Sequence, residues 1–280
     1  MKKIIAYLKL LRVKHYIKNT LIFIPVIFAH VLTRSNVKSA CFGFLAFCFM
    51  ASVIYIVNDI KDVNNDRMHP TKKNRPIASG KISISEANIL AIIMFMLSLA
   101  MNYFVKERII SYTILFIYFS FNLFYSFGLK KKPIIDIILL VSFYILRIYY
   151  GGFIIGVAIS DWLFLTVTFA ALYLTFGKRR NEYMKSKDTR DVLRLYNKDF
   201  LDKFMYLSLA LTLVFYSLWV IEQQISYLSF SVLILLIIFL KYSLIVEGES
   251  DGDPTEIVFK NKSLLVWGFI YIIFMFLMMR

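Results

Sequence analysis

Three aspartates follow one another where an apolar stretch ends, in the run NDIKDVNND over residues 58–66. If a helix continues through this run, Asp59, Asp62 and Asp66 share one face, with Asn58 beside them. Converging carboxylates repel each other unless a cation joins them. Mg²⁺ takes one or two carboxylates and fills its remaining positions with water and phosphate oxygens. The spacing therefore predicts that the three aspartates bind Mg²⁺ and, through it, a diphosphate.

Basic residues follow the aspartates at once, in the segment RMHPTKKNRPIASGK over residues 67–81. Arginine binds phosphate through a planar fork and lysine through a movable point charge, so we expect Arg67, Lys73 and Arg75 to contact the substrate. The segment contains Pro70, Pro76 and Gly80, which disfavour a continuous helix, so we expect it to form a loop. The alternative is a solvated loop in which the acids only balance these cations. An acid at the end of an apolar span is costly and favours the metal site.

Further polar side chains lie at the ends of other apolar stretches. We expect substrate contacts from Tyr125, Lys130, Asp136, Lys178 and Arg179. Arg147 lies within an apolar stretch and is also a candidate, although it could instead pair with an acid and hold helices together. The Gly177–Glu182 segment could likewise be ordinary basic anchoring at a membrane surface.

These residues require a membrane scaffold. The chain has 280 residues, of which 59% are hydrophobic and only 18% charged, and its mean hydropathy is +0.68. A soluble domain is about a quarter charged. We expect one all-α domain over residues 1–280, a helix bundle around a central cavity that opens to the cytoplasmic side. The expected spans are 17–33, 39–58, 87–105, 109–127, 134–157, 161–177, 204–221, 226–246 and 264–279.

The distribution of Lys and Arg predicts the orientation of this bundle. Positively charged short loops stay in the cytoplasm. An inside N-terminus leaves Arg147 within a span and, outside, only Arg34, Lys38, Lys106, Arg108 and Arg280. The loops 58–86, 178–203 and 247–263 are then long, polar and inside. Since loops on a rigid scaffold carry function, we expect the active site to face the cytoplasm from the cell membrane.

The remaining composition excludes other classes. The net charge of +15 is concentrated on one predicted membrane face, which fits topology and anionic lipids better than nucleic acid. Cys41 and Cys48 lie in one span and argue against a disulfide framework or a thiolate metal site. The basic amphipathic start has no small-residue cleavage site, so no cleavable signal peptide is expected.

The motif NDIKDVNNDRMHPTKKNRPIASG resembles the first aspartate-rich motif of the UbiA superfamily of intramembrane prenyltransferases. Nearly the whole chain is similar to its decaprenyl-phosphate phosphoribosyltransferase branch. The segments that carry this likeness are 9–25 (KLLRVKHYIKNTLIFIP), 125–136, 146–152, 177–182 and 252–258 (GDPTEIV). The second aspartate-rich motif of the superfamily is missing here, because Asp136 and a KRRNE stretch stand in its place. That departure argues against a prenyl-diphosphate donor.

The resemblance implies transfer of a 5-phosphoribosyl group from phosphoribosyl diphosphate to a polyprenyl phosphate, with Mg²⁺ as cofactor and no nucleic acid partner. Asp59 and Asp62, assisted by Asp66, would hold the metal-bound diphosphate. Positioning and electrostatic stabilisation would carry most of the rate. The basic residues above, together with Lys18 and Asn19, would divide between the donor's phosphates and the lipid phosphate.

Two other functions stay open at this point. One is a UbiA-type enzyme that moves an isoprenoid from a prenyl diphosphate to an aromatic or quinone-precursor acceptor. The other is a transporter or lipid-binding membrane protein. Transporters show paired helix interruptions in corresponding halves and acids at mid-membrane, whereas the acids here gather at one predicted face.

Overall fold

The computed structural model describes residues 2–29, 31–69, 71–185, 190–248 and 253–279, and within these residues every regular element is a helix. Pro70 and Gly252, quoted above in two motifs, lie outside the described residues. Contacts divide the chain into two compact units. The first comprises Met1–Val26, Val31–Ser126 and Arg147–Val157, and the second Ile27–His30, Phe127–Leu146 and Ala158–Arg280.

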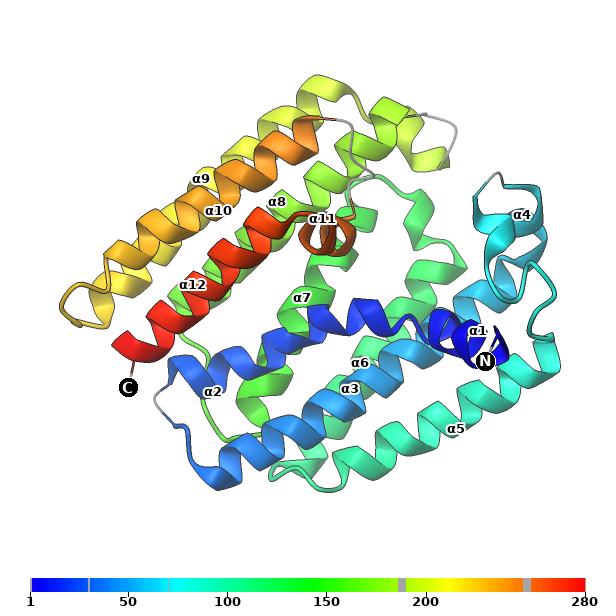
Figure 1. Cartoon of the computed structure of the whole chain (residues 1–280), viewed down its shortest axis with the longest axis horizontal. Coiled ribbons are helices and arrows are strands. Elements are labelled where there is room, and N and C mark those ends of the chain that lie inside the picture. The colour runs from blue at the N-terminus through cyan, green and yellow to red at the C-terminus, as the bar shows by residue number, and fades with distance from the viewer. Residues whose placement is uncertain (1, 30, 70, 186–189, 249–252, 280) are drawn as a thin grey trace. The chain divides into compact units, whose positions relative to one another are not determined.

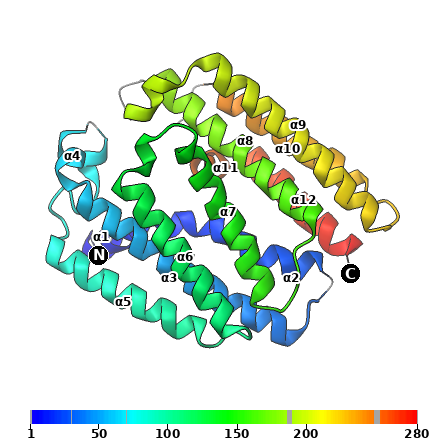
Figure 2. The same cartoon turned by 180° about the vertical axis from the view of Figure 1, so that it is seen from behind.

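The first unit is built on a long helix, α3, that supplies the aspartate motif. The unit contains α1 (Lys2–Leu10), the 3₁₀ helix η1 (Val13–Phe23), α3 (Arg34–Lys61), α4 (Val63–Met68), η2 (Lys72–Asn74), α5 (Ile84–Asn102) and nearly all of α6 (Arg108–Phe127). Helices α3 and α5 lie side by side in both views of the chain (Figures 1 and 2). Ser98 Oγ on α5 donates to the carbonyl of Ala46 on α3 at 2.7 Å. Such interhelical bonds stabilise packed helices in lipid.

Local signals fix where these helices begin. Thr33 accepts a hydrogen bond from Asn36 N and caps α3. Ser83 and Glu86 form a capping box at the start of α5. Lys3 Nζ reaches the same Glu86 carboxylate at 2.6 Å, so it ties α1 to the beginning of α5. The capping box and Lys3 therefore fix the beginning of α5, to which the loop after α4 leads.

Helix α7 (Ile135–Phe153) carries Gly151 against the backbone of η1. A Cβ at Gly151 would clash with the Ile22 carbonyl oxygen and lie 3.0 Å from the Ile22 carbonyl carbon. Backbone cannot move aside as a side chain can. We therefore expect Gly151→Ala to lower the free energy of unfolding by about 1–3 kcal/mol, measured by thermal unfolding in detergent. Gly268→Ala is the control, since nothing lies within 4 Å of its added Cβ; equal stability of both variants would contradict the expectation.

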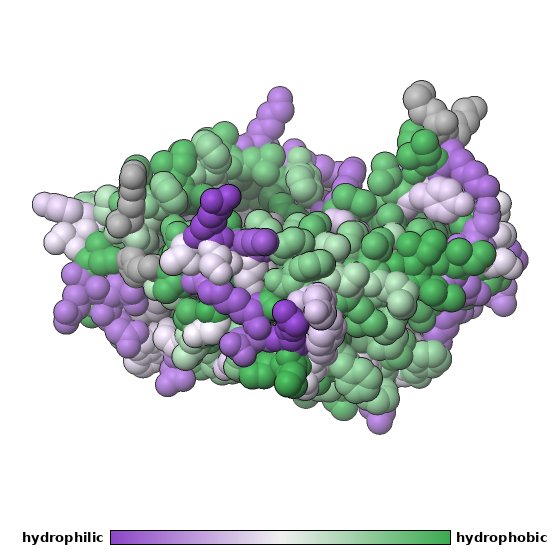
Figure 3. All heavy atoms as spheres, turned by 90° about the horizontal axis from the view of Figure 1, so that it is seen from below, coloured by the Kyte–Doolittle hydropathy of each residue, from purple (hydrophilic) through white to green (hydrophobic). Residues whose placement is uncertain are grey.

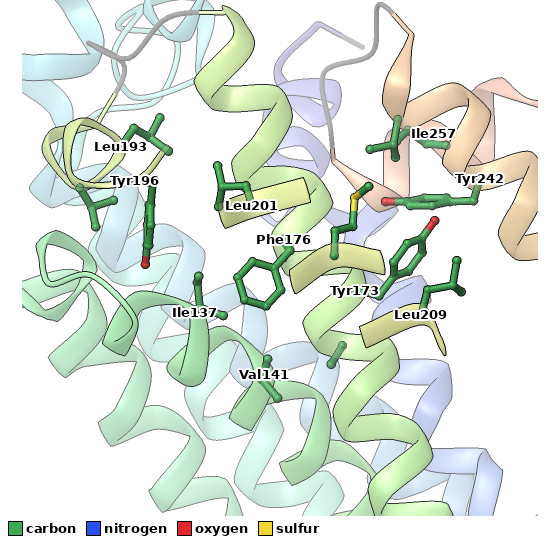
Figure 4. Packing of buried hydrophobic residues seen from close by; sticks show 14 of the residues in the cluster. Ile137, Val141, Tyr173, Phe176, Leu193, Tyr196, Leu201, Leu209, Tyr242 and Ile257 are labelled. Carbon is green, nitrogen blue, oxygen red and sulfur yellow. The ribbon is translucent and has the colours of Figure 1, made fainter. Parts of the chain in front are cut away.

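The second unit packs around α8 and α9. It contains the first part of α7, α8 (Asp161–Lys185), the 3₁₀ helices η3 (Leu129–Lys131) and η5 (Asp191–Leu195), α9 (Lys198–Glu222), α10 (Phe230–Glu247), α11 (Pro254–Lys260) and α12 (Lys262–Met278). Its core is a cluster that includes Ile137, Tyr173, Phe176, Leu201 and Tyr242. Figure 4 shows these side chains from α7, α8, α9 and α10 filling one region. Tyr173 OH and Ser243 Oγ share a 2.6 Å hydrogen bond within it.

Six helices in the described residues are long and apolar enough to cross a membrane, namely α3, α5, α6, α7, α9 and α10. A seventh span results if α11 and α12, bent by 96° at their junction, count as one. Nine spans therefore stay a prediction. The expectation of a single helix over 17–33 was wrong, because η1 ends at Phe23 and the short α2 (Ile24–Phe28) follows it. Pro25 has no N–H to continue a backbone ladder and is accommodated in the first turn of α2.

Apolar side chains point outward from several of these helices. On α5 the exposed residues include Ile89, Ile92 and Met96, and on α12 they include Phe269 and Ile272. Figure 3 shows hydrophobic residues covering much of the face that it draws, with hydrophilic residues gathered in patches. Exposed apolar surface of this extent is typical of helices that face lipid.

Candidate active site

The aspartate motif lies where α3 ends and α4 begins. The helix does not run through it, because Asp62 caps α3 with φ −88° and ψ 6° and α4 starts at Val63. Asp59 and Asp66 are buried and Asp62 is half-buried. Asp62 therefore lies at the junction of two helices and not within one continuous helix.

Asp59 and Asp66 converge on one arginine. Arg75 Nη1 lies 3.1 Å from Asp59 Oδ1 and 2.7 Å from Asp66 Oδ2. A second guanidinium approaches from the N-terminal segment, with Arg12 Nη2 at 2.6 Å from Asp59 Oδ1. Both aspartates are only 3% exposed, so each charge depends on these partners. A buried carboxylate without a partner would cost several kcal/mol.

Oxygen atoms of two carboxylates thus contact the same guanidinium nitrogen, Arg75 Nη1. Among the residues that the structure describes, no group of three or more His, Cys, Asp or Glu side chains could hold a metal ion. The expected three-aspartate cluster is therefore not assembled, and the physical reason is the break at Asp62. The pair of Asp59 and Asp66 does fit Mg²⁺, a hard ion that one or two carboxylates can hold when phosphate and water complete its shell.

Arg12 is a member of this site that the sequence reasoning missed. Its backbone is left-handed, with φ 52° and ψ 46°, a conformation that costs a non-glycine residue roughly 1–2 kcal/mol. Its guanidinium lies over the Tyr55 ring at 4.6 Å from the centroid while it binds Asp59. The strain is offset by these contacts. One signal could have found it: a buried acid at a helix end needs cations, and Arg12 lies in the basic N-terminal stretch.

The loop after α4 presents the remaining cations. Burial and the neighbouring Lys72 lower the pKa of His69, so the neutral ring accepts hydrogen bonds at Nδ1 from the backbone of Thr71 and Lys72. Arg67 and Lys73 are exposed, and Asn58 is half-buried at the end of α3. Lys61 Nζ donates to the Ser126 carbonyl at 2.6 Å. Arg67 and Lys73 are therefore open to an anionic ligand.

Arg147 lies in a polar group within the first unit. It is buried and donates to Asn19 Oδ1 at 2.8 Å and to the Tyr118 hydroxyl at 3.1 Å. Asn19 in turn donates to Cys48 Sγ at 3.1 Å. The structure thus brings together Asn19 and Arg147, two of the predicted substrate contacts. Lys18, next to Asn19 on η1, is half-buried.

A second charged group lies in the second unit and centres on Arg179. Its side chain is 1% exposed, with Nε at 2.7 Å from Asp136 Oδ2 and Nη1 at 2.6 Å from Glu182 Oε2. Tyr196 donates to Asp136 Oδ1 at 2.6 Å and accepts from the backbone of Ile134. Burial and the hydrogen bond to Asp136 raise the pKa of Tyr196, so it stays a donor. Arg179 is enclosed by carboxylates, and its ion pair with Asp136 joins α8 to α7.

The other predicted contacts are accessible. Lys178 lies 3.2 Å from Asp253, whose other carboxylate oxygen caps α11 by accepting from Thr255 N. Lys130 and Tyr125 are half-buried, on η3 and near the end of α6. Lys178 therefore links the end of α8 to the segment GDPTEIV, of which the structure describes Asp253 onward.

Comparison with known proteins decides which family this is. The model of the UbiA prenyltransferase family matches residues 21–273. The chain belongs to the UbiA prenyltransferase family. It is 31% identical to decaprenyl-phosphate phosphoribosyltransferase of Corynebacterium glutamicum, over 97% of this chain and 87% of that protein. The enzyme of the same name from Mycobacterium tuberculosis is 30% identical over 91% of this chain and 88% of its own length.

Solved structures of the UbiA family share the fold. A UbiA homologue from Archaeoglobus fulgidus bound to GPP and Mg²⁺ has a TM-score of 0.75 at 22% identity, with 96% of each chain covered. The same homologue bound to DMAPP and Mg²⁺ has a TM-score of 0.74 at 22% identity, again with 96% of each chain covered.

The family resemblance seen in the motifs is confirmed, and this UbiA protein is a transferase. Together with its long apolar helices, the family makes it an integral membrane protein. The transporter alternative is thereby excluded. The relatives support the transferase activity, while the roles of the individual site residues stay predictions.

Proposed function

We propose that this transferase moves the 5-phosphoribosyl group of phosphoribosyl diphosphate to a polyprenyl phosphate and releases diphosphate. The observation that carries the proposal is the likeness to two enzymes named decaprenyl-phosphate phosphoribosyltransferase over more than nine-tenths of this chain. The buried carboxylate pair beside a cationic loop supports it, because a donor with a diphosphate leaving group requires both features.

The donor's diphosphate binds at the junction of α3 and α4. Asp59 and Asp66 would hold Mg²⁺, with Asp62 as a further candidate ligand between them in the sequence. When bound, this ion neutralises the charge that grows on the diphosphate as it leaves. Arg67, Lys73 and Arg75 bind the phosphate oxygens, and Asn58 donates from the last turn of α3. These assignments rest on the convergence of the two carboxylates and on the exposure of Arg67 and Lys73.

The reaction exchanges one bond at C1 of the ribose. An oxygen of the lipid phosphate forms a bond to C1 while the bond from C1 to the diphosphate oxygen breaks, and its electron pair leaves with the diphosphate. The lipid phosphate is already an anion, so no general base is needed. The protein acts by holding both anions in line and by opposing their charges with fixed cations.

The lipid phosphate is bound by the remaining basic groups. The candidates for this anion are Lys18, with Asn19 and Tyr125 as hydrogen-bond partners, in the first unit, and Lys130 and Lys178 in the second unit, each unit taken by itself. Arg147 positions Asn19 through its 2.8 Å bond. Arg179 and Asp136 were predicted to contact the substrate directly. Because they pair with each other in the buried core, we instead propose that they position Lys178.

The donor enters from the cytoplasm, where water-soluble phosphorylated sugars are made. The asymmetry of Lys and Arg supports an inside N-terminus and an inward-facing site. The polyprenyl tail then remains in the bilayer. The nine spans, and a cavity open to the same side for the tail, remain part of this proposal.

One alternative is supported by a specific observation. The A. fulgidus homologue is bound to GPP and Mg²⁺, so a prenyl diphosphate could be the donor, with an aromatic or quinone-precursor acceptor. The replacement of the second aspartate-rich motif by Asp136 and the KRRNE stretch, where Arg179 is enclosed, weighs against that reading.

A donor assay separates the two. Purified protein is incubated with Mg²⁺, polyprenyl phosphate and phosphoribosyl diphosphate labelled in the ribose, and the label is followed into the organic phase. We expect a labelled lipid that requires both the divalent ion and the lipid phosphate. Label that stays wholly aqueous, while a prenyl diphosphate is consumed with an aromatic acid, would contradict the proposal.

A further inference from the structure

Arg75 holds the position where the two buried carboxylates meet. Its Nη1 atom alone contacts both, at 3.1 Å from Asp59 Oδ1 and 2.7 Å from Asp66 Oδ2. A point that lies between two carboxylate oxygens is also where a hard divalent ion binds best. The guanidinium and the ion therefore compete for the same oxygens.

The charges of this group already balance. Asp59 and Asp66 contribute two negative charges, and Arg12 and Arg75 contribute two positive ones. A divalent ion that entered with Arg75 still in place would make the group strongly positive in a site where both acids are buried. The ion therefore binds well only if Arg75 leaves or if further negative charge arrives.

Arg75 can leave without unfolding its loop. Its backbone is fixed, since its N–H donates to Lys72 O and its carbonyl accepts from Ser79 N, both at 2.9 Å. The neighbouring Pro76 and Ile77 are buried. Its side chain, however, is 26% exposed, so rotation about side-chain bonds can carry the guanidinium toward solvent and toward any anion bound there.

We propose that Arg75 closes the carboxylate pair in the donor-free enzyme and is displaced by the metal onto the donor's diphosphate. This inference rests on the proposed function, in which Asp59 and Asp66 hold Mg²⁺. Arg75 then has two successive partners, the carboxylates and the phosphate oxygens, and arginine suits both because its planar fork matches either anion. The exchange couples the two ligands: the metal frees Arg75 for the diphosphate, and the diphosphate draws Arg75 away from the metal site.

The test measures metal and diphosphate binding separately in the full-length protein in detergent. Mn²⁺ replaces Mg²⁺ and is followed by electron paramagnetic resonance of the free ion, with no phosphate present. Arg75→Gln removes the competing charge, so we expect it to bind Mn²⁺ about fivefold or more tightly than the native protein. At saturating Mn²⁺, calorimetry with inorganic diphosphate should show about tenfold or more weaker binding, because a charged hydrogen bond is lost.

Tighter Mn²⁺ binding together with weaker diphosphate binding is what the exchange predicts. If Arg75 only supported the loop, its replacement would weaken the binding of both ligands. Arg75→Lys should shift in the same directions by less, and it carries the test if the neutral variant does not fold. Lys81→Ala removes one charge from the exposed end of the same loop and should change neither affinity.

Unchanged or weaker Mn²⁺ binding by Arg75→Gln would overturn this inference and leave the proposed function standing. Failure of the proposed function is recognised separately. The donor assay would then give no labelled lipid, or Asp59→Asn would bind Mn²⁺ as the native protein does.

Discussion

Asp59→Asn is expected to lower turnover by about 100- to 1,000-fold, which is the effect of removing one preorganised electrostatic partner from a reacting centre. Asp59 is buried and contacts both Arg12 and Arg75. Asn keeps the shape of the side chain but loses the charge that binds the divalent ion. The measurement is formation of labelled lipid at saturating donor. Asp66→Asn should cost as much, because Arg75 bridges Asp66 and Asp59.

Two controls separate this loss from a general defect. Asp161→Asn makes the same chemical change at an exposed position at the start of α8, and Arg34→Ala removes a charge at the start of α3, the end remote from Asp59. Both should keep native turnover. A fully active Asp59→Asn/Asp62→Asn double variant, folded by circular dichroism, would remove the metal site from the mechanism.

Arg179→Ala is expected to lower the free energy of unfolding by about 3–5 kcal/mol, since it leaves the buried Asp136 without its ion-pair partner, while Glu182 keeps Arg190 at 3.1 Å. Asp136 is 0% exposed and Glu182 is 16% exposed at the side chain. The measurement is the midpoint of thermal unfolding in detergent. Tyr196→Phe removes one hydrogen bond from Asp136 and should cost less, about 1–2 kcal/mol.

An exposed ion pair from the same unit is the matched control. Lys131 and Asp191 lie 3.0 Å apart with side chains 65% and 69% exposed. Their solvated charges contribute little, so Lys131→Ala should change the unfolding free energy by less than about 0.5 kcal/mol. Equal destabilisation by Arg179→Ala and Lys131→Ala would show that the buried network does not stabilise the unit.

The metal motif was predictable in its residues and less so in its geometry. Asp59 and Asp66 could be selected from an acid run at the end of an apolar helix. Their pairing could not, because α3 ends and α4 begins at Asp62 and both carboxylates bind Arg75 from a later loop. Helical spacing describes a continuous helix only. Arg75 was expected to bind phosphate, and its contact with both carboxylates depends on the path of the loop.

Long-range partners were the main information missing from the sequence. Arg12 and Asp59 are 47 residues apart, and Asp136 and Arg179 are 43 apart. No local pattern pairs such residues. The apolar helices were easier to predict, since length and hydropathy are local properties of the sequence. The predicted spans include those of α3, α5, α6, α7, α9 and α10. The first predicted span failed because hydropathy does not distinguish a 3₁₀ helix from an α-helix.

The order in which the partners of Asp59 are synthesised has a consequence for membrane insertion. Arg12 leaves the ribosome 47 residues before Asp59, and Arg75 follows 16 residues after it. The acid therefore reaches the translocon with one neutralising partner already made and the second soon to emerge. The charge of Asp59 near the end of α3 can thus be neutralised during translation, before the later helices of the chain are synthesised.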